Sequence, residues 1–280
     1  MGNKTAFLTT IFPTKEAYLR DFFQSLERQT YVKFDTLVVN DGYAELDSLK
    51  KQYTRLNIVE LPCDDTPAKN RELGINFAIT QGYDNLIFGD SDDYFSDNRV
   101  ERSLELLKNC DIVVNDLCLF NENGVISRNY ISNRIPNNSR VTIDFIKNKN
   151  IFGLSNTAIH LSGIHKVDFD KELVAVDWFF YSNLLLDKKI AVFTNEAQTF
   201  YRQHGKSTVG IGKLNAVNFE LTLKVKEKHY RLLKDKCEEY RQMHGSVKDL
   251  QKKISTFSIL DQSLPENPLW WESQNYERAG

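Results

Sequence analysis

The chain contains no stretch that approaches the ~18 consecutive apolar residues needed to span a membrane as a helix. Its first residues, Met1 to Lys4, lead directly into a strand-like segment and lack the apolar region of a signal peptide. We therefore expect a cytoplasmic protein, with at most a peripheral contact with the inner face of a membrane.

The sequence also lacks an excess of positive charge. It has 36 Lys and Arg residues against 38 Asp and Glu residues, so the formal net charge is -2. Binding to nucleic acid would require a clustered excess of Lys and Arg, which is missing here. We therefore expect no nucleic-acid partner.

Cysteine is scarce, and its spacing is uninformative. The four cysteines form no Cys-x-x-Cys pair and have no metal-ligand spacing: Cys63, Cys110, Cys118 and Cys237. This pattern is typical of free thiols in a reducing compartment.

Short apolar runs alternate with amphipathic stretches in the first 115 residues. Five runs read as strands: Ala6 to Phe12, Thr36 to Asn40, Asn57 to Leu61, Asn85 to Gly89 and Asp111 to Asn115. Between them, apolar residues recur at helical spacing from Leu19 to Leu26, Pro67 suits a first helical turn, and Asp97 is a candidate N-cap. Strict alternation of strand and helix predicts βαβ crossovers, hence an α/β fold with a mostly parallel sheet.

The pattern changes after residue 115. A hairpin is predicted around Asn121 to Gly124, and a helical run at Ile143 to Lys149. Thr157 to Leu161 and Ile190 to Phe193 read as strands, with a helix at Asp177 to Asp187 between them. From about Leu214 to Phe257 the sequence is charged and helix-prone.

The most informative feature is the acidic run Asp90-Ser91-Asp92-Asp93, directly after a predicted strand. In an open α/β sheet, ligands bind at the carboxyl ends of the strands. Three carboxylates within four residues repel one another unless a cation lies between them. Carboxylate oxygens suit Mg²⁺ or Mn²⁺, which in turn bind diphosphate oxygens. A solvated acidic turn that caps the next helix is the alternative.

A second carboxylate, Asp41, ends another predicted strand and is followed by Gly42. An Asp-Gly pair after a strand is often only a turn. The combination with Asp90 is more informative, since both would lie at the same edge of the sheet.

Several motifs of the sequence together resemble glycosyltransferase family 2, which has the nucleotide-binding GT-A fold. The matching pieces occur in the family's order across residues 5 to 205: Leu37-Val38-Val39-Asn40-Asp41-Gly42, Arg71-Glu72-Leu73-Gly74-Ile75, Ile87-Phe88-Gly89-Asp90-Ser91-Asp92-Asp93, Phe169-Asp170 with Val176-Asp177-Trp178, and Tyr201-Arg202-Gln203-His204. Two places depart from the family's pattern. Ile11-Phe12-Pro13-Thr14 replaces the usual motif after the first strand, and Glu72 stands where an Asn usually follows the Arg.

The resemblance implies a role for each matching position. The nucleotide-sugar donor, with UDP as the expected nucleotide, would be bound by Ile11, Pro13, Asp41, Arg71, Asp90 and Arg202. The divalent metal, Mn²⁺ or Mg²⁺, would be bound by Asp92, Asp93 and His204. Asp177 would be the catalytic base.

The chemistry of sugar transfer is consistent with those roles. A nucleoside diphosphate can leave only if its developing charge is stabilised, which a metal and cationic side chains can do. The acceptor hydroxyl needs a base, and Asp177 is the candidate, although a helix N-cap is its alternative role. One base without a second nucleophile favours single displacement with inversion.

The resemblance also divides the chain. We expect a GT-A catalytic domain at residues 1–213 and a C-terminal helical extension at residues 214–280. Within the domain, residues 1–115 would bind the nucleotide-sugar and residues 116–213 the acceptor, a glycan or a lipid-linked sugar of cell-surface polysaccharide synthesis. Leu269-Trp270-Trp271 could dock on the body, form a homo-oligomer contact or touch a membrane surface.

Two other functions remain open from the residues alone. A nucleotidyltransferase also uses strand-end aspartates and a metal, but it would need a Gly-rich basic loop where Ile11-Phe12-Pro13-Thr14 stands. A catalytically silent nucleotide-sugar-binding module would differ from an enzyme only in donor turnover.

Overall fold

The computed structural model describes residues 3–203, 216–253 and 267–272. Their centre is a ten-stranded sheet in the order β3-β2-β1-β4-β9-β6-β10-β5, with β7 beside β6 and β8 beside β10. The strands are β1 (Thr5–Ile11), β2 (Asp35–Asp41), β3 (Asn57–Cys63), β4 (Asn85–Phe88), β5 (Tyr94–Phe95), β6 (Ile112–Asn121), β7 (Gly124–Ser127), β8 (Arg140–Val141), β9 (Thr157–His160) and β10 (Ala191–Arg202).

The direction of the strands confirms the predicted fold class. β1 pairs in parallel with both β2 and β4, β2 with β3, and β6 with β10. β9 is antiparallel to both of its neighbours and separates β4 from β6. The sheet is therefore mostly parallel, with β9 reversed at its middle. The short strands β5 and β8 pair antiparallel with β10, and β7 pairs antiparallel with β6.

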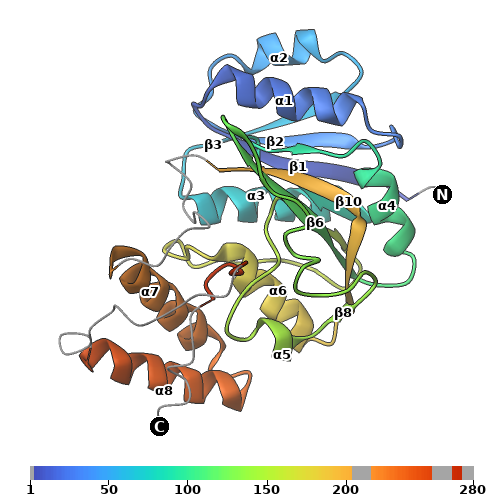
Figure 1. The fold of residues 1–280 in the computed structure, drawn as a ribbon. Helices are drawn as coiled ribbons and strands as arrows, with labels where there is room; N and C mark the ends of the chain where they lie inside the picture. Colours follow the sequence, from blue (N-terminus) through green and yellow to red (C-terminus); the bar gives the residue numbers. More distant parts are fainter. Residues whose placement is uncertain (1–2, 204–215, 254–266, 273–280) are drawn as a thin grey trace.

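Helices cover both faces of this sheet. They are α1 (Glu16–Glu27), α2 (Leu46–Gln52), α3 (Pro67–Thr80), α4 (Arg99–Leu106), α5 (Ile143–Ile146), α6 (Val176–Leu186), α7 (Ala216–Leu233) and α8 (Glu238–Lys253). Figure 1 shows α1 and α2 on one side of the sheet, α3 on the other, and α7 and α8 as a pair next to α6.

Alternation along the strands builds a separate core on each face. In β1, Phe7 and Ile11 pack into the cluster that contains the apolar residues of α1, α2 and α4. Leu8, one residue on, packs into the larger cluster with α3, α6 and α7. Helix α3 comes close to the sheet at Gly74, where an added Cβ would lie 2.5 Å from Leu8 Cδ1.

Several predicted elements differ in extent. β10 runs to Arg202, well past the predicted end at Phe193, because it pairs with β6 on both sides of an irregularity between Thr194 and Gln198. Helix α5 has only four residues. The predicted N-cap Asp97 is wrong: α4 starts at Arg99 after Asn98, and the carboxylate of Asp97 instead pairs with Arg28 at 3.3 Å.

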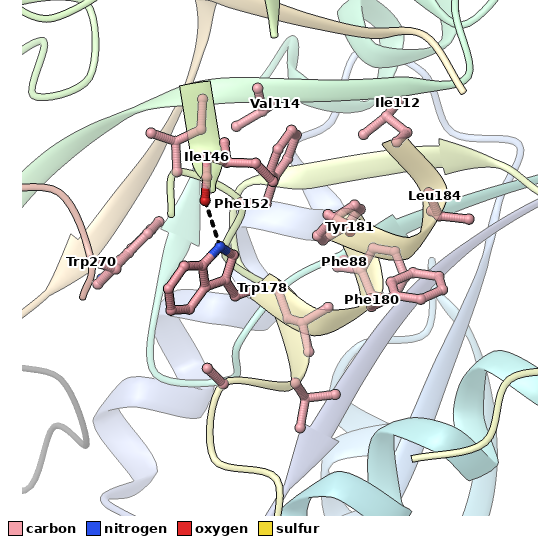
Figure 2. Packing of buried hydrophobic residues seen from close by; sticks show 14 of the residues in the cluster. Phe88, Ile112, Val114, Ile146, Phe152, Trp178, Phe180, Tyr181, Leu184 and Trp270 are labelled. Carbon is pink, nitrogen blue, oxygen red and sulfur yellow. Dashed lines mark hydrogen bonds between the residues drawn. The ribbon is translucent and has the colours of Figure 1, made fainter. Parts of the chain in front are cut away.

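The tryptophan pair near the C-terminus docks on the body of the protein. Trp270 and Trp271 are buried, and the Asn150 N–H donates to the Trp270 carbonyl at 2.8 Å. Docking on the body is therefore the one of the three predicted roles that the structure shows. Figure 2 places Trp270 at the edge of the cluster that contains Phe152 and Trp178. Within the described residues, no helix is both long and apolar enough to cross a membrane.

Candidate active site

The predicted donor residues meet at one edge of the sheet, where β1, β2 and β4 end. Ile11 is the last residue of β1 and is fully buried, whereas Pro13 follows it at the exposed surface. Asp41 is the last residue of β2, whose Asn40 pairs with Ile11. Asp90 follows β4, the neighbour of β1 on its other side. Parallel pairing thus brings together side chains from three segments that are distant in sequence.

The carboxylate of Asp41 is oriented by a buried amide. Asn70 Nδ2, from the first turn of α3, donates to Asp41 Oδ2 at 2.9 Å. Because Asn70 is almost fully buried, its position is fixed by packing. Asp41 is half-buried and leads into the turn at Gly42, which has φ +78°. Its carboxylate is therefore held in place at the surface of the sheet edge.

Asp90 lies beside the cationic side chain of Arg71 and next to the loop that contains Ser155. Arg71 Nη2 lies 3.6 Å from Asp90 Oδ1, and the Asp90 N–H donates to Ser155 Oγ at 3.3 Å. Burial raises the pKa of Asp90 above its ordinary value, while the charge of Arg71 opposes the rise. Arg71 also donates to the Pro67 carbonyl at 3.3 Å, which directs its guanidinium along α3.

The two remaining aspartates of the run have different surroundings. Asp93 is almost fully buried; Ser155 Oγ donates to its Oδ2, and the Arg202 N–H donates to its Oδ1 at 2.7 Å. Burial, reinforced by Asp92 and Asp90, raises its pKa well above the ordinary value. Asp92 is half-buried, and its backbone carbonyl accepts from Arg202 Nε at 2.7 Å. Asp93 thus has structural partners on both oxygens, and Asp92 is the more accessible of the two.

Arg202 contacts the acidic run in a way that the sequence did not predict. Its Nη2 forms an ion pair with Asp21 at 2.6 Å, and its guanidinium lies between the rings of Tyr18 and Phe120, at 4.3 and 4.5 Å from their centroids. Together with its bond to the Asp92 carbonyl, these contacts fix the backbone of the acidic run. They favour a positioning role over direct contact with a diphosphate.

Asp177 lies in the first turn of α6, and it is not the N-cap, which is Ala175. Its Oδ1 accepts from the Trp178 N–H at 2.8 Å. Burial raises the pKa of Asp177 to about 7; the Trp178 N–H and Arg71 oppose the rise, and Asp90 adds to it. The half-buried carboxylate of Asp177 therefore lies within electrostatic reach of the strand-end groups. A carboxyl with such a pKa can accept a proton near neutral pH.

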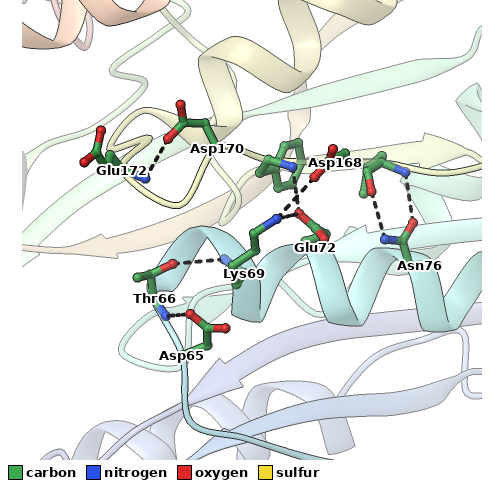
Figure 3. Close-up of polar contacts among 10 residues, drawn as sticks. Asp65, Thr66, Lys69, Glu72, Asn76, Asp168, Asp170 and Glu172 are labelled. Carbon is green, nitrogen blue, oxygen red and sulfur yellow. Dashed lines mark hydrogen bonds and ion pairs between the residues drawn. The ribbon is translucent and has the colours of Figure 1, made fainter.

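The segment that leads to α6 is held by helix α3, as Figure 3 shows. Glu72 Oε2 accepts from the Phe169 N–H and from Lys69 Nζ, each at 2.7 Å. Asn76 exchanges two hydrogen bonds of 2.9 Å with the backbone of Val167. The acid at position 72 therefore ties the two halves of the site together.

Three further residues surround the strand-end aspartates, and the sequence did not predict them. Ser155 gave no signal, because its role depends on a loop that approaches Asp90 and Asp93 only in the folded chain. Asn70 precedes the noted Arg71 in α3, and its role depends on the pairing of β1 with β2. Tyr201 belongs to the Tyr-Arg-Gln-His run; burial and the nearby carboxylates, Asp93 first among them, raise its pKa well above the ordinary value.

The donor set fits a divalent metal that shares its shell with a substrate. Asp92 provides a hard carboxylate oxygen at the half-buried surface of the run, whereas both oxygens of Asp93 already accept hydrogen bonds. No group of three or more His, Cys, Asp and Glu side chains that could hold a metal occurs among residues 3–203, 216–253 and 267–272. Mg²⁺ is usually bound by one or two carboxylates together with substrate phosphates, so such a protein cage is not required. The predicted third ligand, His204, lies outside the described residues.

Comparison with known sequences identifies the family. The profile described as "Glycosyl transferase family 2" matches residues 9–163, more than half of the chain. The chain belongs to glycosyltransferase family 2. No curated protein sequence matches it.

Solved structures show that this member of the family has the GT-A fold. Residues 1–349 of S. aureus TarS in complex with UDP-GlcNAc superpose with a TM-score of 0.65 at 16% identity, covering 90% of this chain and 73% of that one. The same protein in complex with UDP gives a TM-score of 0.63 at 17% identity, covering 92% and 73%. GalNAc-T7 with UDP, GalNAc and Mn²⁺ gives 0.63 at 11% identity, covering 89% and 51%.

Proposed function

We propose that this glycosyltransferase transfers a sugar from a UDP-sugar donor to an acceptor hydroxyl with inversion at the anomeric carbon. The observation that carries the proposal is the meeting of Asp41 and the Asp90–Asp93 run at one sheet edge, with Asp177 within electrostatic reach. The TarS complexes with UDP-GlcNAc and UDP support a uridine nucleotide.

The donor lies on residues 1–115 in this proposal. Pro13 and the backbone of Ile11, whose side chain is buried, border the base, and Asp41, oriented by Asn70, accepts a hydrogen bond from it. Asp90 lies near the ribose. Arg71, whose Nη2 lies 3.6 Å from Asp90 Oδ1, offsets the charge of the diphosphate. Asp92 would hold Mn²⁺ or Mg²⁺, which would supply positive charge near the leaving diphosphate. Arg202 fixes the backbone of Asp92 through their hydrogen bond.

The acceptor lies on residues 116–213, with Asp177 as the general base. A carboxyl with a pKa of about 7 can remove the proton of the attacking hydroxyl as its oxygen bonds to the anomeric carbon. The nucleoside diphosphate then leaves from the opposite face, which produces inversion. We assign the acceptor to glycans or lipid-linked sugars of cell-surface polysaccharide synthesis.

A ligand screen followed by turnover tests the proposal. UDP-sugars should raise the melting temperature of the full chain in the presence of Mn²⁺, since a ligand that binds only the folded state stabilises it. The same sugars on GDP or CMP are the controls for the base. Transfer is then followed as UDP release with acceptor, and inversion by the NMR coupling of the new anomeric proton. Binding without any UDP release would leave a silent binding module, and stabilisation by GDP-sugars alone would contradict the assigned donor.

A further inference from the structure

The C-terminal segment, residues 267–272, is tied to the body by a dense set of polar contacts. The guanidinium of Arg134 pairs with both carboxylate oxygens of Glu272, at 2.8 and 2.9 Å, and donates to the Asn267 carbonyl at 2.7 Å. The Tyr130 hydroxyl donates to the Pro268 carbonyl. With the bond from Asn150 to Trp270, these contacts hold a short segment far along the chain in one defined place.

The indole of Trp270 fills the space between two other segments. At Gly153, an added Cβ would lie 3.0 Å from Trp270 Cη2 and 3.4 Å from Cζ3, so a side chain there would require the indole to shift by a few tenths of an ångström. The ring of Tyr201 meets the indole edge-on, with centroids 5.7 Å apart and planes at 77°. Trp270 itself is only 9% exposed, so its indole packs against protein atoms and does not offer an open face to a ligand.

Each of these two neighbours is close in sequence to a residue that holds Asp93. Ser155, two residues after Gly153, donates to one carboxylate oxygen of Asp93. Arg202, directly after Tyr201, donates its backbone N–H to the other. Ser155 also accepts from the Asp90 N–H, so the same hydroxyl joins both ends of the acidic run.

We propose that Trp270 is a positioning residue for the Asp90–Asp93 run, which it fixes by packing between Gly153 and Tyr201. The proposal rests on the proposed function, since that function assigns this run to the ribose of the donor and to the metal. It assigns the C-terminal segment to the active site, although the segment contributes no group to the chemistry.

The physical reason lies in the burial of Asp93. A buried carboxylate is stable only while hydrogen-bond donors stay aligned with both oxygens. One donor is carried by the loop at Gly153 and the other by the end of β10 at Tyr201. Removing the indole between them would let the two donors move independently, and the geometry of Asp92 next to Asp93 would loosen.

Amide hydrogen exchange on the full chain without nucleotide tests this directly. Trp270→Ala should increase exchange in peptides that cover residues 88–95 and 153–157 by about tenfold, because local opening is less opposed. Exchange in β1 and β2 should stay as in the wild type. Trp270→Phe should restore most of the protection, and Trp271→Phe, a change in the neighbouring indole, is the matched control. Gly153→Ala, whose Cβ would lie 3.0 Å from Trp270 Cη2 and from Asn156 Oδ1, should increase exchange in the same peptides, but by less than Trp270→Ala.

Calorimetry then connects the packing to binding. UDP titrated with Mn²⁺ should bind Trp270→Ala about tenfold more weakly than wild type, whereas UDP in EDTA should lose less affinity, because Asp41 is unaffected and only the contact of Asp90 with the ribose is loosened. If wild type fails to bind UDP, the proposed function fails while the exchange result still decides the positioning role. Unchanged exchange at residues 88–95 in Trp270→Ala would overturn the inference, as would a Mn²⁺-dependent UDP affinity equal to that of wild type.

Discussion

Residues 1–115 and residues 116–203 contribute to the site in different ways. In the first region, β1, β2, β3 and β4 lie beside one another in parallel, so each strand end brings its own side chain to the edge. In the second region, β9 enters antiparallel between β4 and β6, and its preceding loop places Ser155 against the acidic run. In the proposed function the first region thus presents groups to the donor, held by its own Asn70 and by Ser155 of the second region, which also adds Asp177.

The sharpest test of this comparison is a change in the second region that should leave donor binding intact. Asp177→Asn keeps the shape of the side chain and removes its basicity. Transfer to acceptor should fall by ~10²-fold or more, the scale of general-base catalysis, while the Kd for UDP with Mn²⁺ changes little. Single-turnover rates with saturating donor measure the effect. A large loss of UDP affinity would instead place Asp177 among the donor contacts.

The next test separates two neighbouring aspartates of the first region. Asp92→Asn should weaken Mn²⁺-dependent UDP binding by at least ~10-fold, because it removes a charged hard-oxygen ligand. Asp93→Asn is the comparison variant: it loses one of the two oxygens that accept from Ser155 and Arg202, so it should lower the melting temperature and weaken Mn²⁺-dependent UDP binding less than Asp92→Asn does. Isothermal titration with and without Mn²⁺ compares them. Equal UDP affinities in both variants and wild type would remove the metal assignment.

A third test uses the two ends of one strand. Asp41→Asn should weaken UDP binding by about tenfold even in EDTA, since a hydrogen bond to a charged group contributes ~1.5–3 kcal/mol. Asp35→Asn, at the opposite end of β2, alters a carboxylate that accepts from Asn57 and Tyr83 and should leave UDP affinity unchanged. Should the two variants bind UDP alike, the sheet edge at Asp41 would not be the site of the base.

A smaller effect is expected where the two regions are joined. Glu72→Gln weakens the link between α3 and the segment at Phe169. It should raise the acceptor KM by about threefold at constant donor affinity, because Gln still accepts from the Phe169 N–H and loses only an ion pair that solvent screens. Asp168→Asn, whose side chain is 84% exposed and pairs with the same Lys69, is the control and should have no effect. An equal KM in Glu72→Gln and wild type would show that this link does not orient the acceptor region.

The smallest effect concerns stability as a function of pH. The pKa of Asp177 is about 7 in the folded protein, above its ordinary value of 3.8, so folding favours the protonated form. Its stabilising contribution is full below the ordinary value and is lost as the pH rises through about 7. Asp177→Asn should therefore raise the melting temperature relative to wild type more at pH 8.5 than at pH 5. A difference that does not change with pH would argue against the raised pKa.

The sequence alone determined the architecture and the main chemical groups. In the first 115 residues, short apolar runs alternate with stretches of helical periodicity, which predicted the parallel strands. This pattern is local, because the residues of one segment alone show which of its faces is buried. The placement of Asp41 and Asp90 directly after strands predicted their meeting, since parallel strands end at the same edge. The family motif added Asp177, whose position relative to the edge no local pattern could give.

Only the tertiary structure decided how those groups are held. Ser155 and Asn70 act through contacts 62 and 29 residues distant in sequence, with Asp93 and Asp41 respectively. The sequence shows that Arg202 is positively charged but not where its guanidinium points. Its direction is set by contacts with the rings of Tyr18 and Phe120 and by the ion pair with Asp21. From the sequence, Trp270 is only an aromatic residue near the end of the chain; its contacts with Gly153 and Tyr201 are known only from the structure. Periodicity and strand order follow from local burial, but orientation depends on the particular atoms that folding brings within van der Waals and hydrogen-bond distance.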